Sequence, residues 1–377
     1  MGEQKNLFLA IGLSIAIIVV FQLLFPQQAQ VKNDVNEINE QIQPAASIDN
    51  NNTNVTQITK PKEEVINLSK RVIIDTPSLS GSINLEGAIL DDLILLKYNE
   101  KLNDNSKKIN LFSPDGTSNP YFFELGWMQL SNESIPTELP TSKTNWYSSG
   151  SNLSVNNPIT LSWTNNENIT FKIIYEIDEN YLFNISQIIE NNSSRTLKLY
   201  PYRQIKRINL PKTINFFILH EGLISQLDGK LLEKKYDHLL DDCSSMSSGK
   251  KLFCDQESTG GWLGFTDKYW MATLIPDQEK SINANFRHGK NDGRDNFRVG
   301  YVGQLMDIPS NTLNSYGGML FAGAKNLKLL KEYKNNGVPK FTDAIDWGWF
   351  AFLTKPISYA INWFYGYVGN FGLAIIA

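Results

Sequence analysis

Cysteine and histidine are scarce in this sequence: 377 residues contain two cysteines and three histidines. No CxxC or HExxH spacing occurs, so the usual ligand frameworks of zinc and related metal centres are missing. Basic residues show no excess, because 35 Lys and Arg stand against 39 Asp and Glu, a formal net charge of -4. Proteins bind a phosphate backbone chiefly through positive charge, so we expect no nucleic acid partner.

Motifs for nucleotide binding and nucleophilic catalysis are also missing. Three glycines, Gly260, Gly261 and Gly264, lie in the segment TGGWLGFTDKYW, but no GK[ST] follows them. We therefore interpret them as turn glycines beside strand aromatics. No G-x-S-x-G nucleophile elbow occurs.

Few residues remain as candidates for chemistry. His220 and Glu221 are adjacent, and neighbours on a strand point to opposite faces, which makes them a poor acid–base pair. His238, Cys243 and Cys254 match no zinc spacing, and outside the cytosol two cysteines more commonly form a disulfide. We assign no catalytic, cofactor-binding or metal-binding residue, and predict that Cys243 and Cys254 are bonded if they face an oxidising compartment.

An uncharged apolar run lies near the N-terminus, from Leu7 to Phe25. Its length is close to the roughly 20 residues that cross a bilayer, and no small-residue cleavage site follows it. Residues 1–25 are therefore predicted to be an uncleaved transmembrane anchor, with the N-terminus in the cytoplasm because Lys5 precedes the run. Residues 26–70, rich in Asn and Gln and poor in aromatics, are predicted to be a flexible tether.

Residues 71–335 show short β-rich runs separated by Asn, Gly, Pro and Ser. Alternation is clearest at Ile169–Asp178 and Tyr181–Glu190, with a hairpin turn between them. The other predicted runs are Val72–Asp75, Ser80–Leu85, Tyr121–Trp127, Leu197–Tyr202, Ile205–Leu210, Ile214–His220, Trp270–Ile275, Ile282–Arg287, Phe297–Val302 and Thr312–Ala322. This spacing predicts a mainly β protein with a large antiparallel β-sandwich, closed by one helix at Asn326–Tyr333.

The C-terminal segment has membrane-like composition, because only Asp346 and Lys355 are charged between Asp346 and Ala377. Residues 336–368 are predicted to be a linker and an amphipathic helix along the bilayer interface, beginning near Pro356. The residues expected at the interface are Trp347, Trp349, Ile357, Ile361, Trp363, Phe364 and Val368. A buried core helix is the alternative for this segment. Residues 369–377 are expected to begin a second transmembrane helix.

Several of these segments together resemble the Gram-negative bacterial YidC-type membrane protein insertases. The resemblance covers the order of anchor, tether and β domain, and it is most specific at the C-terminal end, 346–349 and 369–372. The segment 321–325, Phe-Ala-Gly-Ala-Lys, also contributes. In the β domain the matching residues, which we expect to be structural, are Gly261, Trp262, Gly264, Thr266, Asp267, Tyr269 and Trp270.

The resemblance implies a galactose-mutarotase-like supersandwich in the periplasm and no cofactor. It implies a chaperone-like insertase of the inner membrane, multi-pass at full length, that assists nascent inner-membrane proteins alone or with the Sec translocon and its accessory subunits. The family's hydrophilic groove with its intramembrane arginine would lie after residue 377, and no Arg occurs after Arg298. This chain would be the periplasmic accessory portion.

Two other classes of function stay open at this point. A membrane-anchored periplasmic carbohydrate-binding or mutarotase-like enzyme would need facing His and carboxylate side chains on a concave sheet. An envelope binding module would use the same cleft for extended ligands. The enzyme class would not need the membrane-like sequence that follows residue 346.

Overall fold

The computed structural model describes residues 59–101, 106–130, 135–211, 220–243, 254–291, 293–348 and 351–376. The predicted anchor, most of the predicted tether and Trp349 lie outside these ranges. So does the predicted strand 214–220, apart from His220. Residues 59–70, predicted as tether, contain the short helix α2 (Lys62–Ile66).

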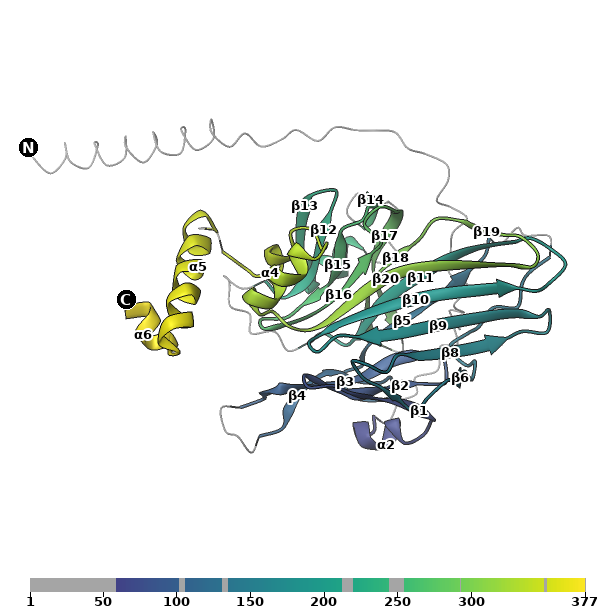
Figure 1. Cartoon of the computed structure of the whole chain (residues 1–377), viewed down its shortest axis with the longest axis horizontal. Coiled ribbons are helices and arrows are strands. Elements are labelled where there is room, and N and C mark those ends of the chain that lie inside the picture. The colour runs from purple at the N-terminus through teal and green to yellow at the C-terminus, as the bar shows by residue number, and fades with distance from the viewer. Residues whose placement is uncertain are drawn as a thin grey trace, which may run out of the picture. The chain divides into compact units, whose positions relative to one another are not determined.

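Two stacked β-sheets make up the domain (Figure 1). The first runs in the order β14 (Asp255–Thr259), β17 (Ser281–Asn291), β18 (Arg294–Val302), β11 (Leu197–Ile208), β5 (Tyr121–Met128), β3 (Ile89–Asn99), β2 (Leu79–Asn84), β1 (Arg71–Asp75) and β7 (Asn152–Leu153), with β19 (Met306–Ile308) beside β11 and β4 (Lys108–Phe112) beside β3. The second runs β13 (Lys230–Lys235), β12 (Gly222–Leu227), β15 (Trp262–Thr266), β16 (Trp270–Pro276), β20 (Thr312–Ala324), β10 (Leu182–Asn191), β9 (Ile169–Ile177), β8 (Ile159–Thr164) and β6 (Tyr147–Ser148).

The mainly β fold and the sandwich are as predicted, with one exception to the antiparallel pairing. Strands β1 and β7 are parallel, through Ile73 with Asn152 and Ile74 with Leu153. The alternation predicted for β9 is confirmed, because Ile173, Tyr175 and Ile177 are buried while Glu176 is exposed. In the predicted turn between β9 and β10, the Asp178 carboxylate accepts hydrogen bonds from the backbone N–H groups of Asn180 and Leu182.

Polar residues inside strands explain two errors in the strand prediction. The two runs predicted at Leu197–Tyr202 and Ile205–Leu210 form one strand, β11, because buried Arg203 interrupts only the apolar pattern and not the pairing. Its guanidinium donates to the Gln187 side chain and the Ile185 carbonyl on the other sheet. Arg203 therefore joins the two sheets through hydrogen bonds.

Strand β3 was not predicted because Asp91 and Asp92 interrupt its apolar run. A β-bulge places Asp91 as the extra residue, since Ser82 pairs with Asp92 and Ile83 pairs with Leu90. Asp91 forms an ion pair with Arg71 of β1, and Asp92 lies 2.6 Å from Lys62 of α2. The two acids thus fasten β1 and α2 to this sheet.

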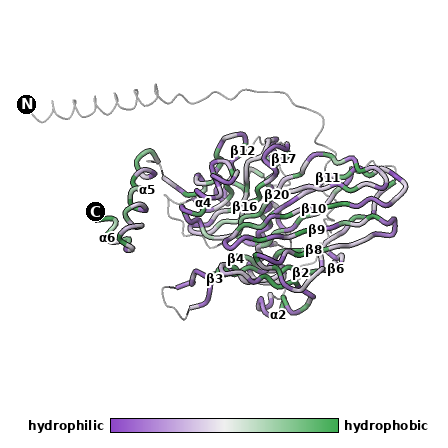
Figure 2. Tube along the Cα trace, viewed as in Figure 1, coloured by the Kyte–Doolittle hydropathy of each residue, from purple (hydrophilic) through white to green (hydrophobic). Residues whose placement is uncertain are grey.

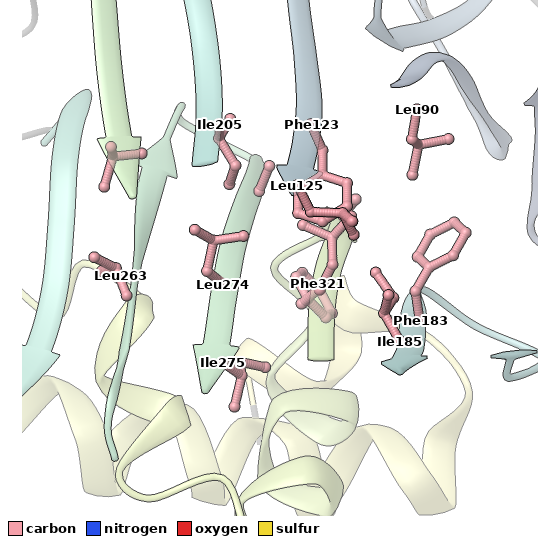
Figure 3. Packing of buried hydrophobic residues seen from close by; sticks show 14 of the residues in the cluster. Leu90, Phe123, Leu125, Phe183, Ile185, Ile205, Leu263, Leu274, Ile275 and Phe321 are labelled. Atoms are coloured by element: carbon pink, nitrogen blue, oxygen red, sulfur yellow. The ribbon is translucent and has the colours of Figure 1, made fainter. Parts of the chain in front are cut away.

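Apolar packing fills two layers. Between the sheets lie side chains such as Leu90, Phe123 and Ile205, all fully buried (Figure 3). Outside the second sheet, Phe321 of β20 contacts Tyr333 of α4 (Leu327–Asn335) and Phe341 of η1 (Phe341–Ala344). Helix α4 is the helix predicted at Asn326–Tyr333, and Asn326 caps it by accepting from the backbone N–H groups of Lys328 and Leu329.

The remaining helices are α3 (Tyr236–Asp242), α5 (Ala351–Val368) and α6 (Phe371–Ile376). The prediction that Pro356 starts the C-terminal helix is wrong, because α5 already begins at Ala351 and contains Pro356. Thr354 explains part of the early start, since its hydroxyl donates to the Trp347 carbonyl and supports the first turn. None of the helices in the described part of the chain has the length and apolarity needed to cross a membrane.

Candidate functional site: the junction of the β domain and helix α5

Three of the segments singled out in the sequence meet at one end of the sandwich. We call it the exit end, because β20 finishes there at Ala324 and the chain continues into α4. The ammonium group of Lys325 donates to the Thr266 hydroxyl at 2.9 Å, and the Lys325 backbone N–H donates to the Tyr269 carbonyl. The backbone N–H of His220 donates to the Asp346 carboxylate at 2.9 Å. His220 directly precedes Glu221 and β12, and β12 pairs with β15, so segment 346–348 is connected to segments 261–270 and 321–325 in one structural unit.

Arg207 anchors this unit to the other sheet. It lies at the end of β11, and its Nη1 is 2.8 Å from the Asp267 carboxylate and 3.0 Å from the Tyr236 hydroxyl. Its guanidinium also lies over the Tyr121 ring, 4.6 Å from the centroid. Asp267 follows β15 of the second sheet, so this ion pair joins the two sheets at the exit end.

Burial shifts the pKa of several groups in this junction. It lowers the pKa of Lys325, although the carboxylates of Asp267, Asp346 and Glu233 act in the opposite direction. Burial also raises the pKa of Glu233, and the negative charge of Asp346 raises it further. Burial lowers the pKa of His220, as it does that of Lys325. Groups with perturbed pKa values often mark functional sites, so the partners of these groups decide what the site can do.

The partners indicate a structural joint. The charged groups of Lys325, Asp346 and Arg207 contact side chains or backbone of other elements of the same chain. His220 and Glu221 were predicted to lie on a strand, but both precede β12, and the His220 ring nitrogen Nε2 lies 2.7 Å from the Leu223 carbonyl. Within the described ranges no three His, Cys, Asp or Glu side chains are grouped to hold a metal ion.

Asp346 also shapes the chain between η1 and α5. While its Oδ2 accepts from His220, its Oδ1 accepts from the backbone N–H of Gly348, which has a φ of +66°. A positive φ of this size is easily adopted only by glycine. The Trp347 indole donates to the Thr342 carbonyl at 3.0 Å. Asp346 therefore fixes the direction in which the chain leaves the domain.

Helix α5 is amphipathic. Its polar residues Thr354, Lys355, Ser358 and Asn362 recur at helical spacing and form one face. Lys355 lies 2.9 Å from Asp343 of η1, so this face contacts the domain. The other side carries large apolar side chains that are widely exposed, including Phe352 at 78%, Trp363 at 59% and Tyr367 at 75%.

The predicted stripe Ile357, Ile361, Phe364 and Val368 covers only part of this apolar side. Ile357 and Val368 are exposed, while Ile361 and Phe364 are half-buried. Aromatic residues at 352, 359, 363 and 367 form a second stripe at helical spacing; the sequence analysis expected Trp363 at the interface but did not recognise the stripe. Figure 2 shows the hydrophobic residues along α5 and α6. Their contact with a membrane stays a prediction.

The structure places the family-motif residues in different roles. Gly261 lies in a turn at a φ of +86°, and a Cβ at Gly264 would lie 2.0 Å from the Ala272 carbonyl oxygen. Trp262 is buried and donates to the Pro339 carbonyl. Thr266 and Asp267 belong to the junction. Tyr269 is 56% exposed and Trp270 packs edge-on against Tyr98.

A disulfide joins Cys243, at the end of α3, to Cys254, just before β14. The carbonyls of both cysteines accept hydrogen bonds from β17, from His288 and Phe286 respectively. The bridge therefore attaches α3 to the β14–β17 edge.

The sequence analysis did not find Arg207 or Glu233 and did not assign Lys325 or Asp346 to a site. Arg207 and Glu233 look like ordinary charged residues near strand ends. Lys325 is the last residue of one motif segment and Asp346 is the first residue of another, and this position was the available signal.

Comparison with known proteins identifies related chains. The family model of the YidC periplasmic domain matches residues 71–360. "Membrane protein insertase YidC" of Cereibacter sphaeroides is 37% identical over all of this chain and 61% of its own length, and that of Rickettsia canadensis is 38% identical over 98% of this chain and 64% of its own length. The chain thus spans less than two thirds of these relatives.

Solved structures with a similar fold include a galactose mutarotase related enzyme from Lactobacillus acidophilus. It is 9% identical with a TM-score of 0.45, covering 67% of this chain and 97% of the enzyme. A putative aldose 1-epimerase from Escherichia coli is 8% identical with a TM-score of 0.43, covering 67% of this chain and 98% of the other. These values are too low to transfer a residue's role.

Proposed function

The chain belongs to the YidC periplasmic-domain family, and on that premise we propose that it is the periplasmic portion of an inner-membrane protein insertase. The observation that carries this proposal is the junction, which holds an amphipathic helix with a broad exposed apolar side at a fixed exit from the β domain. A helix of this kind is suited to lie in the bilayer interface.

An insertase lowers the cost of moving polar groups of a nascent segment into the bilayer, which is several kcal/mol for each unsatisfied group. No bond of the substrate changes in such a process. We assign this step to no residue of the chain and propose that the β domain is non-catalytic. The domain positions the membrane-embedded part through α5. The β domain also contacts nascent inner-membrane proteins, the Sec translocon and the accessory subunits of the translocon.

Location is tested by reporter fusions. A phosphatase that is active only outside the cytoplasm, fused after Lys70, should be active, and the mature protein should keep the segment from Leu7 to Phe25. A reporter after Lys70 that works only in the cytoplasm would contradict the orientation. A mature N-terminus near Ala29 would contradict the anchor.

Function is tested with the full-length protein in proteoliposomes. Insertion of a nascent inner-membrane protein should require α5, whereas sugar epimerisation should be undetectable. Sugar turnover that disappears after His220→Ala or Glu221→Ala would favour the enzyme alternative instead.

A further inference from the structure

The two ends of the sandwich differ in charge and in aromatic content. At the exit end, the β15–β16 turn carries Lys268 and exposed Tyr269, and α4 exposes Lys328 and Lys331. The β3–β4 hairpin adds exposed Lys97 and Lys101, and its hydrophilic character is visible in Figure 2. We call these six residues the basic patch.

Printed contacts connect the parts of the basic patch to each other. Tyr98 of β3 packs against Trp270 with ring centroids 4.9 Å apart, so the hairpin base touches the β15–β16 turn. Tyr269 accepts a hydrogen bond from the Lys325 backbone, one residue before the cap of α4. The turn, the hairpin and α4 therefore lie together at the exit end.

The basic patch also adjoins α5. The Lys331 ammonium group lies over the Tyr359 ring of α5, 5.5 Å from the centroid. The exposed lysines are thus next to the helix that has the largest exposed apolar surface in the described part of the chain.

The opposite end has a different composition. Its turns, 165–168, 192–195, 277–280 and 309–312, consist mainly of polar residues and contain no aromatic residue. Arg195 is paired there with Glu167 at 2.9 Å, and Lys280 lies 3.8 Å from Asp277. Where the chain turns toward α5, by contrast, the five lysines of the basic patch outnumber the exposed acids of the same elements, Glu100 and Glu332.

From these observations we propose that the basic patch binds the anionic headgroups of the bilayer on which α5 lies, as a second membrane contact. Lysines are attracted electrostatically to an anionic membrane surface when they lie within about a Debye length of it. Tyrosine is favoured at the depth of the lipid headgroups. With α5 as the single membrane contact, the domain and α5 could still roll together about the axis of α5. A second contact, at the basic patch, fixes the tilt of the domain relative to the membrane. This inference rests on the proposed attachment of α5 to the membrane.

The test uses the full chain in nanodiscs of phosphatidylcholine with or without phosphatidylglycerol. A fluorophore is attached to a cysteine introduced at Tyr269→Cys, Asn166→Cys at the opposite end, or Tyr367→Cys on α5, with the native disulfide kept oxidised. Quenching by nitroxides on lipid headgroups is then measured. We expect strong quenching at 269 only with phosphatidylglycerol, and little quenching at 166 in either lipid.

Charge-neutral variants test the chemistry. Changing Lys268, Lys328 and Lys331 to Gln should reduce the ratio of docked to undocked domain about fivefold per lysine, and added salt should mimic the change. Lys143, Lys198 and Lys230 changed to Gln remove the same charge elsewhere and should leave the quenching unchanged. With phosphatidylglycerol present, quenching at 367 without quenching at 269 would overturn this inference alone. Absence of quenching at 367 would overturn the proposed function. Equal effects of the two lysine triplets would also overturn the inference.

Discussion

The Asp346 carboxylate lies 2.9 Å from the backbone nitrogen of His220, a residue 126 positions earlier in the chain. The contact connects the start of the segment leading to α5 with the segment that enters β12. The second carboxylate oxygen of Asp346 accepts a hydrogen bond from the backbone N–H of Gly348, and this bond sets the turn toward α5. One side chain thus links the position of the β domain to the direction of α5.

Asp346→Ala should loosen this exit without unfolding the domain. Hydrogen bonds to a charged group contribute about 1.5–3 kcal/mol each, and 1.4 kcal/mol corresponds to a factor of ten in an equilibrium. We therefore expect the amide hydrogens of His220 and Gly348 to exchange about tenfold faster or more, with amides of β10 unchanged. Hydrogen exchange with mass spectrometry or NMR measures this.

Asp343→Ala is the matched control for Asp346→Ala. It removes the pair with Lys355 but neither hydrogen bond of Asp346. Exchange at His220 should then stay at the wild-type rate. Equal acceleration in both variants would mean that general loosening, and not the Asp346 contacts, controls the exit.

Asp91 predicts a pH dependence of stability. Burial raises the pKa of Asp91 to about 6, against the opposing effect of Arg71. The folded state then holds a proton between about pH 4 and 6 that the unfolded chain, with a carboxyl pKa of about 3.9, has released. The contribution of Asp91 to the free energy of unfolding therefore falls as pH rises through this window.

Asp91→Asn should remove that part of the pH dependence. The variant should gain stability relative to wild type between pH 4 and pH 7 by on the order of 2–3 kcal/mol, and urea unfolding at both pH values measures it. A difference between the two proteins that is the same at pH 4 and pH 7 would show that Asp91 has an ordinary pKa.

The disulfide between Cys243 and Cys254 closes a short loop, with a sequence separation of 11. In the chain-entropy model such a loop is worth roughly 3 kcal/mol. A reducing agent should therefore lower the free energy of unfolding of the wild type by about that amount and leave the Cys243→Ser/Cys254→Ser variant unchanged. Two free thiols in the purified, unreduced protein would refute the bridge.

Strands that alternate in polarity were predictable, and strands with buried charges were not. Strand β9 follows the period of two that a half-buried strand requires, and the structure confirms it. Strand β3 does not follow this period, because Asp91 and Asp92 interrupt it. These two acids are tolerated inside the sheet only because they pair with Arg71 of β1 and Lys62 of α2. Such partners are distant in sequence, so local pattern cannot reveal them.

The junction was only partly predictable for the same reason. The motif segments were visible in the sequence, but their meeting point depends on the pairing of β15, β16 and β20. Pro356 misled the helix boundary, since proline usually marks a first turn. Here α5 begins five residues earlier and includes it.

The last prediction concerns the apolar side of α5. Ile361 and Phe364 are expected to enter the acyl boundary, where each large side chain contributes about 1.5–3 kcal/mol. Changing both to Asp removes this contribution and places two charges at the same depth. The double variant should release α5 from the bilayer and disable insertion, while thermal unfolding of the β domain stays the same.

A control with the same added charge separates membrane contact from simple loss of helix stability. Ser358 and Asn362 lie on the polar face of α5, and changing both to Asp should leave α5 on the membrane because these positions are already polar. A fluorophore at Tyr367→Cys, quenched by nitroxides on lipid chains, reports the contact in each variant. If α5 were the buried core helix of the alternative interpretation, the label would be quenched in neither variant, and the Ile361→Asp/Phe364→Asp change would instead lower the unfolding temperature of the domain. Quenching that is lost only in the Ile361 and Phe364 variant, at an unchanged unfolding temperature, requires that these two side chains meet lipid.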